Sequence, residues 1–242
     1  MSTTKRSVSG SGGQPDRYHH GDLKAALIRA ADEILAEQGL EGFSLREAAR
    51  RAGVSPAAPT HHFGGSAGLL SEVAALGFDE LARHLQVGGD ASPTQRLRMQ
   101  GVGYVRFALA HPGRFQLMFR KDLVNAEHVA LREAGARALA QLEGTIRAMR
   151  AIRPEQALDS QGRAVLLAAW SMVHGFAHLA LDGKLAQMQA GAAPEDLLTG
   201  VLPEMLQSQW PDAVAPAVTS ASTPGKAGDR RKVKGQRAAG QG

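Results

Sequence analysis

The chain has 242 residues, of which 43% are hydrophobic, enough for one large globular domain or two smaller ones. It contains no cysteine, which excludes a disulfide framework, a thiolate metal site and a cysteine nucleophile, and which suits a reducing cytoplasm. The formal net charge is +5, and no apolar stretch follows Lys5 and Arg6 as a signal peptide requires. The longest apolar run, 164–169, is too short to span a bilayer. We therefore expect a cytoplasmic protein without a membrane partner.

Both ends of the chain have the composition of disordered segments. Residues 1–17 and 211–242 are rich in small residues and proline and lack apolar periodicity. The second segment holds much of the positive charge, on Lys226, Arg230, Arg231, Lys232, Lys234 and Arg237. A basic arm adds nonspecific attraction to phosphates, and a solvated tail that aids solubility explains the same composition.

Between these ends the pattern is helical. Apolar residues recur at three- and four-residue steps after Asp22, the predicted N-cap, until Gly39 stops the helix. Further helices are expected at 66–85, 93–110, 112–119, 126–151, 155–182 and 194–209. No segment shows the sustained alternation of a strand, so the predicted fold is all-α. We expect a three-helix N-terminal domain, 18–80, and a larger helical domain, 81–210.

The segment after the first helix has the pattern of a helix-turn-helix. Ser44 and Glu47 have the spacing of a capping box, in which each side chain satisfies the other's backbone amide. The helix that they begin ends at Gly53. Ser55 is then expected to cap a second short helix with Pro56 in its first position. Such a helix is suited to insertion into a groove of DNA.

The second short helix combines small and polar side chains on a surface that suits DNA. Small residues allow close approach of the backbone, polar ones supply hydrogen-bond donors and acceptors, and Phe63 would anchor the helix in the core. The predicted DNA-binding residues are Ser44, Arg46, Ser55, Pro56, Ala57, Ala58, Thr60, His61, His62 and Ser66.

At this point the sequence resembles the TetR family of bacterial transcriptional regulators. FSLREAARRAGVSPAAPTHHF, followed by a helix, is similar to that family's DNA-binding signature over 18–80. The opening YHHGDL, HPGRFQLMF at 111–119 and WSMVHG at 170–175 resemble one subgroup, whose C-terminal domain is marked by Trp-His-Gly. This second resemblance covers much of 95–205.

The resemblance implies a ligand-responsive regulator, acting as a repressor, that binds a palindromic double-stranded operator as a homodimer. It implies that the helices near 155–182 and 194–209 pair across the two-fold axis as a four-helix bundle. It also implies a pocket for a small-molecule effector in the larger domain, and no cofactor. The chain lacks a glycine-rich phosphate loop, a GxSxG motif and a convincing pair of carboxylates, so we expect no enzyme.

Two positions depart from the family pattern. Thr60 stands where the family usually has Tyr, and Ser66 where it usually has Lys. Those family residues contact backbone phosphates, so their loss should weaken binding to DNA. Ser66, as an N-cap after Gly64 and Gly65, would partly compensate by exposing helix amides that can hold a phosphate.

The histidines leave several interpretations open. His174 and His178 share a helix face, with Trp170 one turn before them. They are either a two-ligand metal site without an evident third ligand, a polar point in an effector pocket, or satisfied core residues; we predict no metal. The predicted effector-binding residues are Phe107, Phe115, Met118, Trp170, His174 and His178. The alternatives to a specific regulator are a nonspecific DNA-associated protein of the same fold and a histidine-based metalloenzyme.

Overall fold

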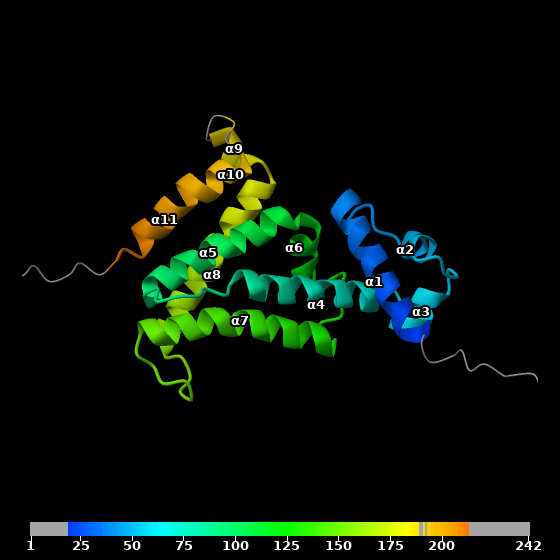
Figure 1. Cartoon of the computed structure of the whole chain (residues 1–242), viewed down its shortest axis with the longest axis horizontal. Helices are drawn as coiled ribbons and strands as arrows, with labels where there is room; N and C mark the ends of the chain where they lie inside the picture. The colour runs from blue at the N-terminus through cyan, green and yellow to red at the C-terminus, as the bar shows by residue number, and fades with distance from the viewer. Residues whose placement is uncertain (1–18, 189–190, 192, 213–242) are drawn as a thin grey trace, which may run out of the picture. The chain divides into compact units, whose positions relative to one another are not determined.

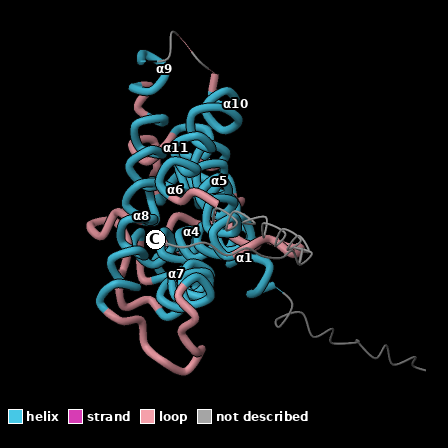
Figure 2. Tube along the Cα trace, turned by 90° about the vertical axis from the view of Figure 1, so that its left-hand side faces the viewer, coloured by secondary structure: helices cyan, strands magenta, loops and turns pink. Residues whose placement is uncertain are grey.

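A computed structural model of the chain describes residues 19–188, 191 and 193–212, without the side chains of 19–22. Within these ranges every regular element is a helix, which confirms the predicted all-α fold (Figures 1 and 2). The predicted N-terminal arm and the tail from residue 213 onward lie outside the described residues. Asp212, which lies within the tail predicted at 211–242, accepts a hydrogen bond of 2.6 Å from the guanidinium of Arg98.

The first four helices follow the predicted order. They are α1 (His19–Gln38), α2 (Leu45–Arg51), α3 (Ala58–Phe63) and α4 (Ser66–His84). Helix α1 begins at His19, so Asp22 lies within the helix and the prediction that it is the N-cap is wrong. Polar residues can belong to a helix without extending its apolar stripe. The stripe alone therefore did not show where α1 begins. The buried residues of that stripe are Leu27, Ala31, Ile34 and Leu35.

The remaining helices also lie close to their predicted ranges. They are α5 (Pro93–Ala110), α6 (Pro112–Met118), α7 (Val129–Met149), α8 (Ser160–Leu181), α9 (Lys184–Met188), α10 (Pro194–Asp196), η1 (Leu197–Val201) and α11 (Leu202–Gln209). Helix α8 begins later than predicted, where the Asp159 carboxylate accepts a hydrogen bond of 2.6 Å from the Gly162 amide. The short helix α9 was not predicted.

The helix predicted at 194–209 contains a π-helical turn, η1, in which the Leu202 N–H bonds to the Leu197 carbonyl. Pro203 follows this turn at the start of α11. Proline has no N–H to give to the carbonyl four residues earlier, so the α-helical ladder is interrupted at this point. The proline therefore divides the predicted helix into successive segments.

Helix α4 packs against both halves of the protein. It contacts α1 and α3, and it also contacts α5, α6 and α7 (Figure 1). A single hydrophobic cluster runs from Leu27 in α1 through Val73 in α4 to Leu206 in α11. The domain boundary predicted at residue 80 falls inside α4, and the packing is continuous across it.

Helix α6 is held closely against α1. A Cβ added at Gly113 would lie 2.3 Å from the carbonyl oxygen of Leu35, so only glycine allows this approach. The next residue, Arg114, forms a two-point ion pair with Asp32 of α1. Together these contacts join the larger part of the protein to the first helix.

Helix α8 is the one helix of the described residues that is long and apolar enough, by length and composition, to cross a membrane. The sequence predicts no membrane-spanning segment, because the longest apolar run, 164–169, is too short to cross a bilayer. Core helices of globular proteins pass the same test, and α8 packs against α5 and α7. Its apolar character therefore also fits a helix that is covered by other protein.

The approach of α5 to α4 provides a test of the packing. A Cβ at Gly103 would lie 2.1 Å from the backbone oxygen of His84, so Gly103→Ala should lower the free energy of unfolding by about 1–3 kcal/mol. Gly144→Ala in α7 is the control, because a Cβ there meets nothing within 4 Å. It should raise stability by up to about 1 kcal/mol. Urea denaturation measures both, and equal effects of the two variants would contradict the close approach.

Candidate DNA-binding surface and effector cavity

The start of α2 forms half of the predicted capping box. The Ser44 hydroxyl accepts a hydrogen bond of 3.1 Å from the Glu47 amide. The Glu47 carboxylate does not return to Ser44, and instead accepts from Arg50 at 2.7 Å and Arg51 at 2.9 Å. The second half of the prediction is wrong because charge-assisted bonds to guanidinium groups are stronger than a bond to a backbone amide.

This ion-pair network also ties α2 to α1. Arg51 lies 2.8 Å from the carboxylate of Glu37 near the end of α1. Hydrogen bonds from Arg50 and then Arg51 lower the pKa of Glu47 to about 2, and Arg51 lowers the pKa of Glu37. The two arginines are therefore paired with carboxylates within the domain, whereas Arg46 is exposed on the first turn of α2.

The second short helix begins later than predicted. Ala57 is the N-cap of α3, and Ser55 and Pro56 lie in the preceding turn, closed by a 3.0 Å bond from the Ala58 amide to the Ser55 carbonyl. Pro59 then stands in the first turn of α3, where its missing N–H leaves no helical bond unmade. Ser55 is therefore not a side-chain cap, although it remains exposed.

Helix α3 has one buried side and one exposed side. Pro59 is buried, and Phe63 packs against the hydrophobic core as predicted. Thr60 and His61 are exposed, and His62 is half-buried with its ring edge-on to that of His61 at 5.0 Å between centroids. The exposed side therefore carries hydroxyl and imidazole groups, while the anchors fix the helix from beneath.

Two glycines separate α3 from α4. Gly64 ends α3 with a φ of +71°, and Gly65 is the N-cap of α4 with a φ of +127°. Ser66 occupies the first helical position, so its predicted role as N-cap is wrong; a φ of +127° is open only to glycine. The first amides of α4 still lack helical partners at an exposed position.

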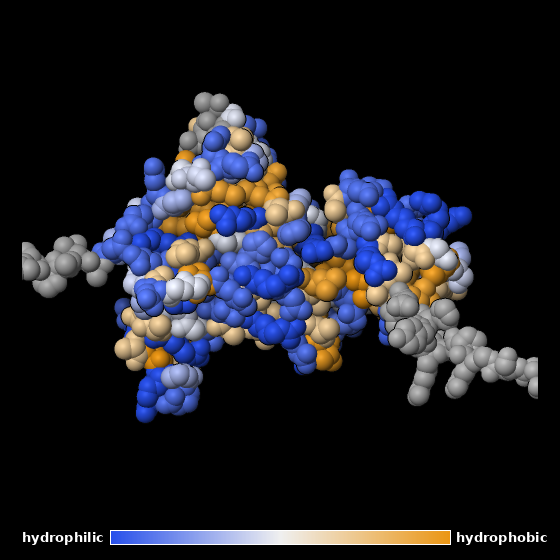
Figure 3. Space-filling model, viewed as in Figure 1, coloured by the Kyte–Doolittle hydropathy of each residue, from blue (hydrophilic) through white to orange (hydrophobic). Residues whose placement is uncertain are grey.

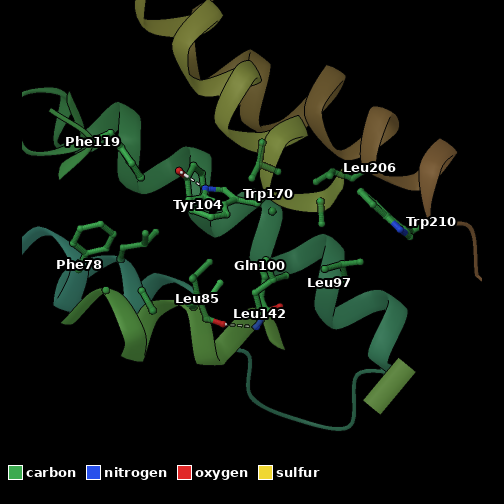
Figure 4. A pocket seen from close by; sticks show the side chains of 17 residues that line it. Phe78, Leu85, Leu97, Gln100, Tyr104, Phe119, Leu142, Trp170, Leu206 and Trp210 are labelled. Atoms are coloured by element: carbon green, nitrogen blue, oxygen red, sulfur yellow. Dashed lines mark hydrogen bonds between the residues drawn. The ribbon is translucent and has the colours of Figure 1, made fainter. Parts of the chain in front are cut away.

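The larger part of the protein forms a partly open cavity of about 320 Å³ (Figure 4), and its lining residues Leu139 and Trp170 are exposed. Helices α4, α5, α7, α8 and α11 supply most of its wall. The lining residues are Phe78, Leu81, Leu85, Leu97, Gln100, Gly101, Tyr104, Phe119, Gly135, Ala138, Leu139, Leu142, Ala169, Trp170, Val173, Leu206 and Trp210. The wall is apolar except for a few polar groups, and no charged side chain belongs to it.

Polar groups beside the cavity form a short chain of hydrogen bonds. The Trp170 indole donates to the Tyr104 hydroxyl at 3.4 Å, and that hydroxyl lies 2.8 Å from Nδ1 of His174. Burial, followed by the neighbouring His178, lowers the pKa of His174, and burial raises the pKa of Tyr104. We therefore assign a neutral imidazole whose Nδ1 accepts from the tyrosine hydroxyl.

His174 and His178 form an aromatic cluster, with ring centroids 4.7 Å apart and with Phe115 and Phe119 beside them. A protein metal site needs more ligands than the two that His174 and His178 would supply. Within the part of the chain that the structure describes, no group of three or more histidines, cysteines or carboxylates is placed to hold a metal ion.

The sequence matches two families whose ranges correspond to these two sites. Residues 27–73 match the family described as bacterial regulatory proteins, tetR family, and 97–205 match the tetracyclin repressor-like C-terminal domain. The chain belongs to the TetR family. A search of curated proteins found no match.

Solved structures share this TetR fold. A protein of unknown function from Rhodococcus sp. RHA1 is 30% identical, with a TM-score of 0.62 over 80% of this chain and 98% of that one. A regulatory protein of the tetR family from Rhodococcus RHA1 is 17% identical, with a TM-score of 0.55 over 76% and 95%. A transcriptional regulator from Rhodococcus sp. Rha1 is 24% identical, with a TM-score of 0.52 over 79% and 99%.

Of the predicted effector-binding residues, only Trp170 lines the cavity, although Phe115, His174 and His178 contact one another. His174 lies behind the cavity, bonded to Tyr104. Phe107, Phe115 and Met118 are buried in the core and are not among the lining residues, and neither is His178. Large apolar residues at helical spacing fit a core as well as a pocket, and only the packing separates the two.

Sequence reasoning missed the polar residues of this cavity, Gln100 and Tyr104. Both lie on the buried face of α5, between Leu97 and Phe107. A glutamine within an apolar stripe was the available indication, because an uncharged polar side chain is seldom buried without a partner or a role.

The Glu47 network yields a pH prediction. Glu47 should titrate near pH 2 instead of near 4.5, because Arg50 and Arg51 favour its ionised form. Since the folded-state pKa is depressed, the stability contributed by the pairs is present above about pH 4.5 and is lost as the pH falls toward 2. Carbon NMR of the side-chain carboxyl measures the midpoint. The variant with Arg50→Ala and Arg51→Ala should return it toward 4.5, and an ordinary midpoint in the unmodified protein would contradict the network.

Proposed function

We propose that this TetR-family protein is a non-enzymatic, homodimeric repressor that binds a palindromic operator in the bacterial cytoplasm and releases it when a small molecule occupies the cavity. The exposed polar side of α3 carries the proposal. A short helix held in the core by Pro59 and Phe63, and presenting Thr60 and His61 outward, is suited to reading base edges in a major groove.

Contacts to phosphate groups would come from the rim of this surface. Ser44, Arg46, Ser55 and Ser66 are all exposed around α3. Arg50 and Arg51 contribute less, because Glu47 and Glu37 neutralise them. With Thr60 and Ser66 in place of the usual Tyr and Lys, few phosphates are neutralised, so binding should show a modest dependence on salt.

Helix α8 supports the homodimer. Only 28% of its most apolar stretch is buried within the protomer. Leu167 and Leu179 are among its exposed apolar residues, and Gly175 is an exposed small residue between them. Figure 3 shows hydrophobic surface in the region of α8 and α11. A second copy that covers α8 would bury this surface, as the four-helix bundle of the family does.

The cavity supports the response to a small molecule. Its volume and apolar wall are typical of sites for small ligands. Helix α4 forms part of this wall and also contacts α3, so a ligand that prefers one position of α4 would favour one spacing of the two recognition helices. DNA is then released because the two states differ in affinity for ligand and operator.

The decisive experiment is selection of bound sequences from a random pool of duplex DNA. A regulator should enrich one palindrome with half-sites about one helical turn apart, or a multiple of that distance. The enriched duplex is then competed against random duplex at a stated salt concentration. A specificity ratio near unity would show a nonspecific DNA-associated protein instead.

Specificity should depend on α3. Thr60→Ala and His61→Ala should each weaken binding to the enriched duplex by about 1–3 kcal/mol if they contact base edges, and leave the melting temperature almost unchanged. Glu133→Ala, at an exposed position of α7, is the control. Fluorescence anisotropy on both duplexes measures the effect. Equal losses on enriched and random duplex would reassign these residues to phosphate contacts.

The dimer should depend on the outer face of α8. A Cβ at Gly175 meets nothing within 4 Å, so Gly175→Arg is compatible with the folded protomer but would place a charge in the proposed interface. We expect a monomer by light scattering and loss of binding to the palindromic duplex. Gly144→Arg in α7, where a Cβ is equally free, should stay dimeric. A dimeric Gly175→Arg protein would place the interface elsewhere.

A further inference from the structure

The cavity contains one buried polar atom without a partner. Gln100 lines the cavity and is 4% exposed, and its Oε1 accepts no hydrogen bond in the described structure. Burial of such an acceptor is costly unless a partner is supplied. An unsatisfied oxygen on a residue that lines an otherwise apolar cavity therefore points to a ligand with a hydrogen-bond donor.

The orientation of the Gln100 amide is determined by its neighbours. Its Nε2 donates to the carbonyl of Leu85 at 3.1 Å (Figure 4). It also donates to the carbonyl of Gln141 at 3.2 Å. Both partners are carbonyl oxygens, which only accept hydrogen bonds, so the amide nitrogen must face them. The amide oxygen is therefore the atom without a partner. Leu85 is the C-cap of α4 and Gln141 lies in α7, so this amide joins α5 to two other helices.

The other polar groups on the wall differ from Gln100. The Tyr104 hydroxyl and the Trp170 indole bond to each other, and the hydroxyl also bonds to His174. Trp210 presents an indole, which can only donate. Among the described lining residues, Gln100 Oε1 is thus the buried side-chain acceptor that has no hydrogen-bond partner.

The size and charge of the cavity restrict the ligand further. A volume of about 320 Å³ lies at the lower end of the range for small-molecule sites. A charged group would be buried without a counter-charge, since the lining residues include none.

We propose that the cavity binds an uncharged, largely aromatic or aliphatic molecule of this size that carries one hydroxyl or N–H group, and that Gln100 Oε1 accepts its hydrogen bond. Gln100 then determines the specificity of the cavity for ligands that carry a hydrogen-bond donor. This inference rests on the proposed function, because it names the class of effector that the regulator would sense.

Gln100 also lines a second cavity, which the test must distinguish from the first. It is more open and more polar, and Leu85 and Gln100 border both cavities. Gln141, Thr145 and Arg96 line only the second one. The same substitution at Gln100 and at Gln141 therefore distinguishes the two locations.

The test compares three naphthalenes substituted at the same ring position: naphthol, methylnaphthalene and naphthoate. Methyl and hydroxyl are similar in size, so the first pair isolates the hydrogen bond, and the third compound adds a negative charge. Calorimetry on the full chain without DNA should show naphthol binding about tenfold or more tightly than either of the others. Equal binding of naphthol and methylnaphthalene, tighter binding of naphthoate, or no binding of naphthol would overturn the proposal.

Three variants locate the interaction. In Gln100→Met the ratio of naphthol to methylnaphthalene affinity should fall to about one. In Gln141→Met the ratio should be unchanged. Gly135→Leu should abolish binding of both compounds, because Gly135 lines the cavity and a Cβ there meets nothing within 4 Å. A preference for naphthol that persists in Gln100→Met, or that disappears in Gln141→Met, would refute the assignment of Gln100 as the acceptor.

The design remains decisive if Gln100→Met is unstable. The ratio compares two ligands on one protein, so a general loss of stability cancels, and the unmodified protein and Gly135→Leu test the cavity without that variant. Failure of the regulator and failure of the cavity are also distinguishable. If the protein prefers no DNA sequence but still binds naphthol more tightly than methylnaphthalene, only the proposal of a specific regulator is refuted. If it prefers one DNA sequence but does not discriminate between the two naphthalenes, only the proposed class of ligand is refuted.

Discussion

The packing of α4 is the constraint on which the rest of the structure depends. One end of this helix contacts α3, and its C-cap, Leu85, receives the hydrogen bond from Gln100 beside the cavity. Closely packed helices do not deform continuously, because their side chains interdigitate at the density of organic crystals. A shift of α4 at one end must therefore be accommodated at its other end. A single closely packed helix thus connects the candidate DNA-binding surface to the cavity.

A second connection runs through α6 and α1. Gly113 allows the α6 backbone to approach the Leu35 carbonyl, and the adjacent Arg114 pairs with Asp32 through both carboxylate oxygens. A two-point ion pair fixes orientation as well as distance. The first helix of the DNA-binding domain is thereby held by the larger domain independently of α4, which limits the relative positions that the two parts can adopt.

Charge is distributed sparingly on the surface proposed to face DNA. Carboxylates on α1 and α2 hold Arg50 and Arg51, so these arginines stabilise the domain more than they attract phosphate. The exposed groups around α3 are mainly hydroxyl and imidazole. Such a surface favours hydrogen bonding over long-range attraction, since hydroxyl groups donate and accept hydrogen bonds without carrying a charge.

The sequence by itself determined the features that depend on neighbours along the chain. The helical ranges, the helix-turn-helix and the Ser44 cap follow from apolar periodicity, glycine and proline, which act within one or two turns. The caps predicted at Ser55 and Ser66 were wrong because the backbone angles of Gly65 and the turn before Ala58 decided those positions. The cavity was decided only by the tertiary structure. Phe107 and Phe115 share an apolar pattern with Trp170, yet the first two fill the core and the third lines a space, because which neighbour each helix face meets is a matter of long-range packing.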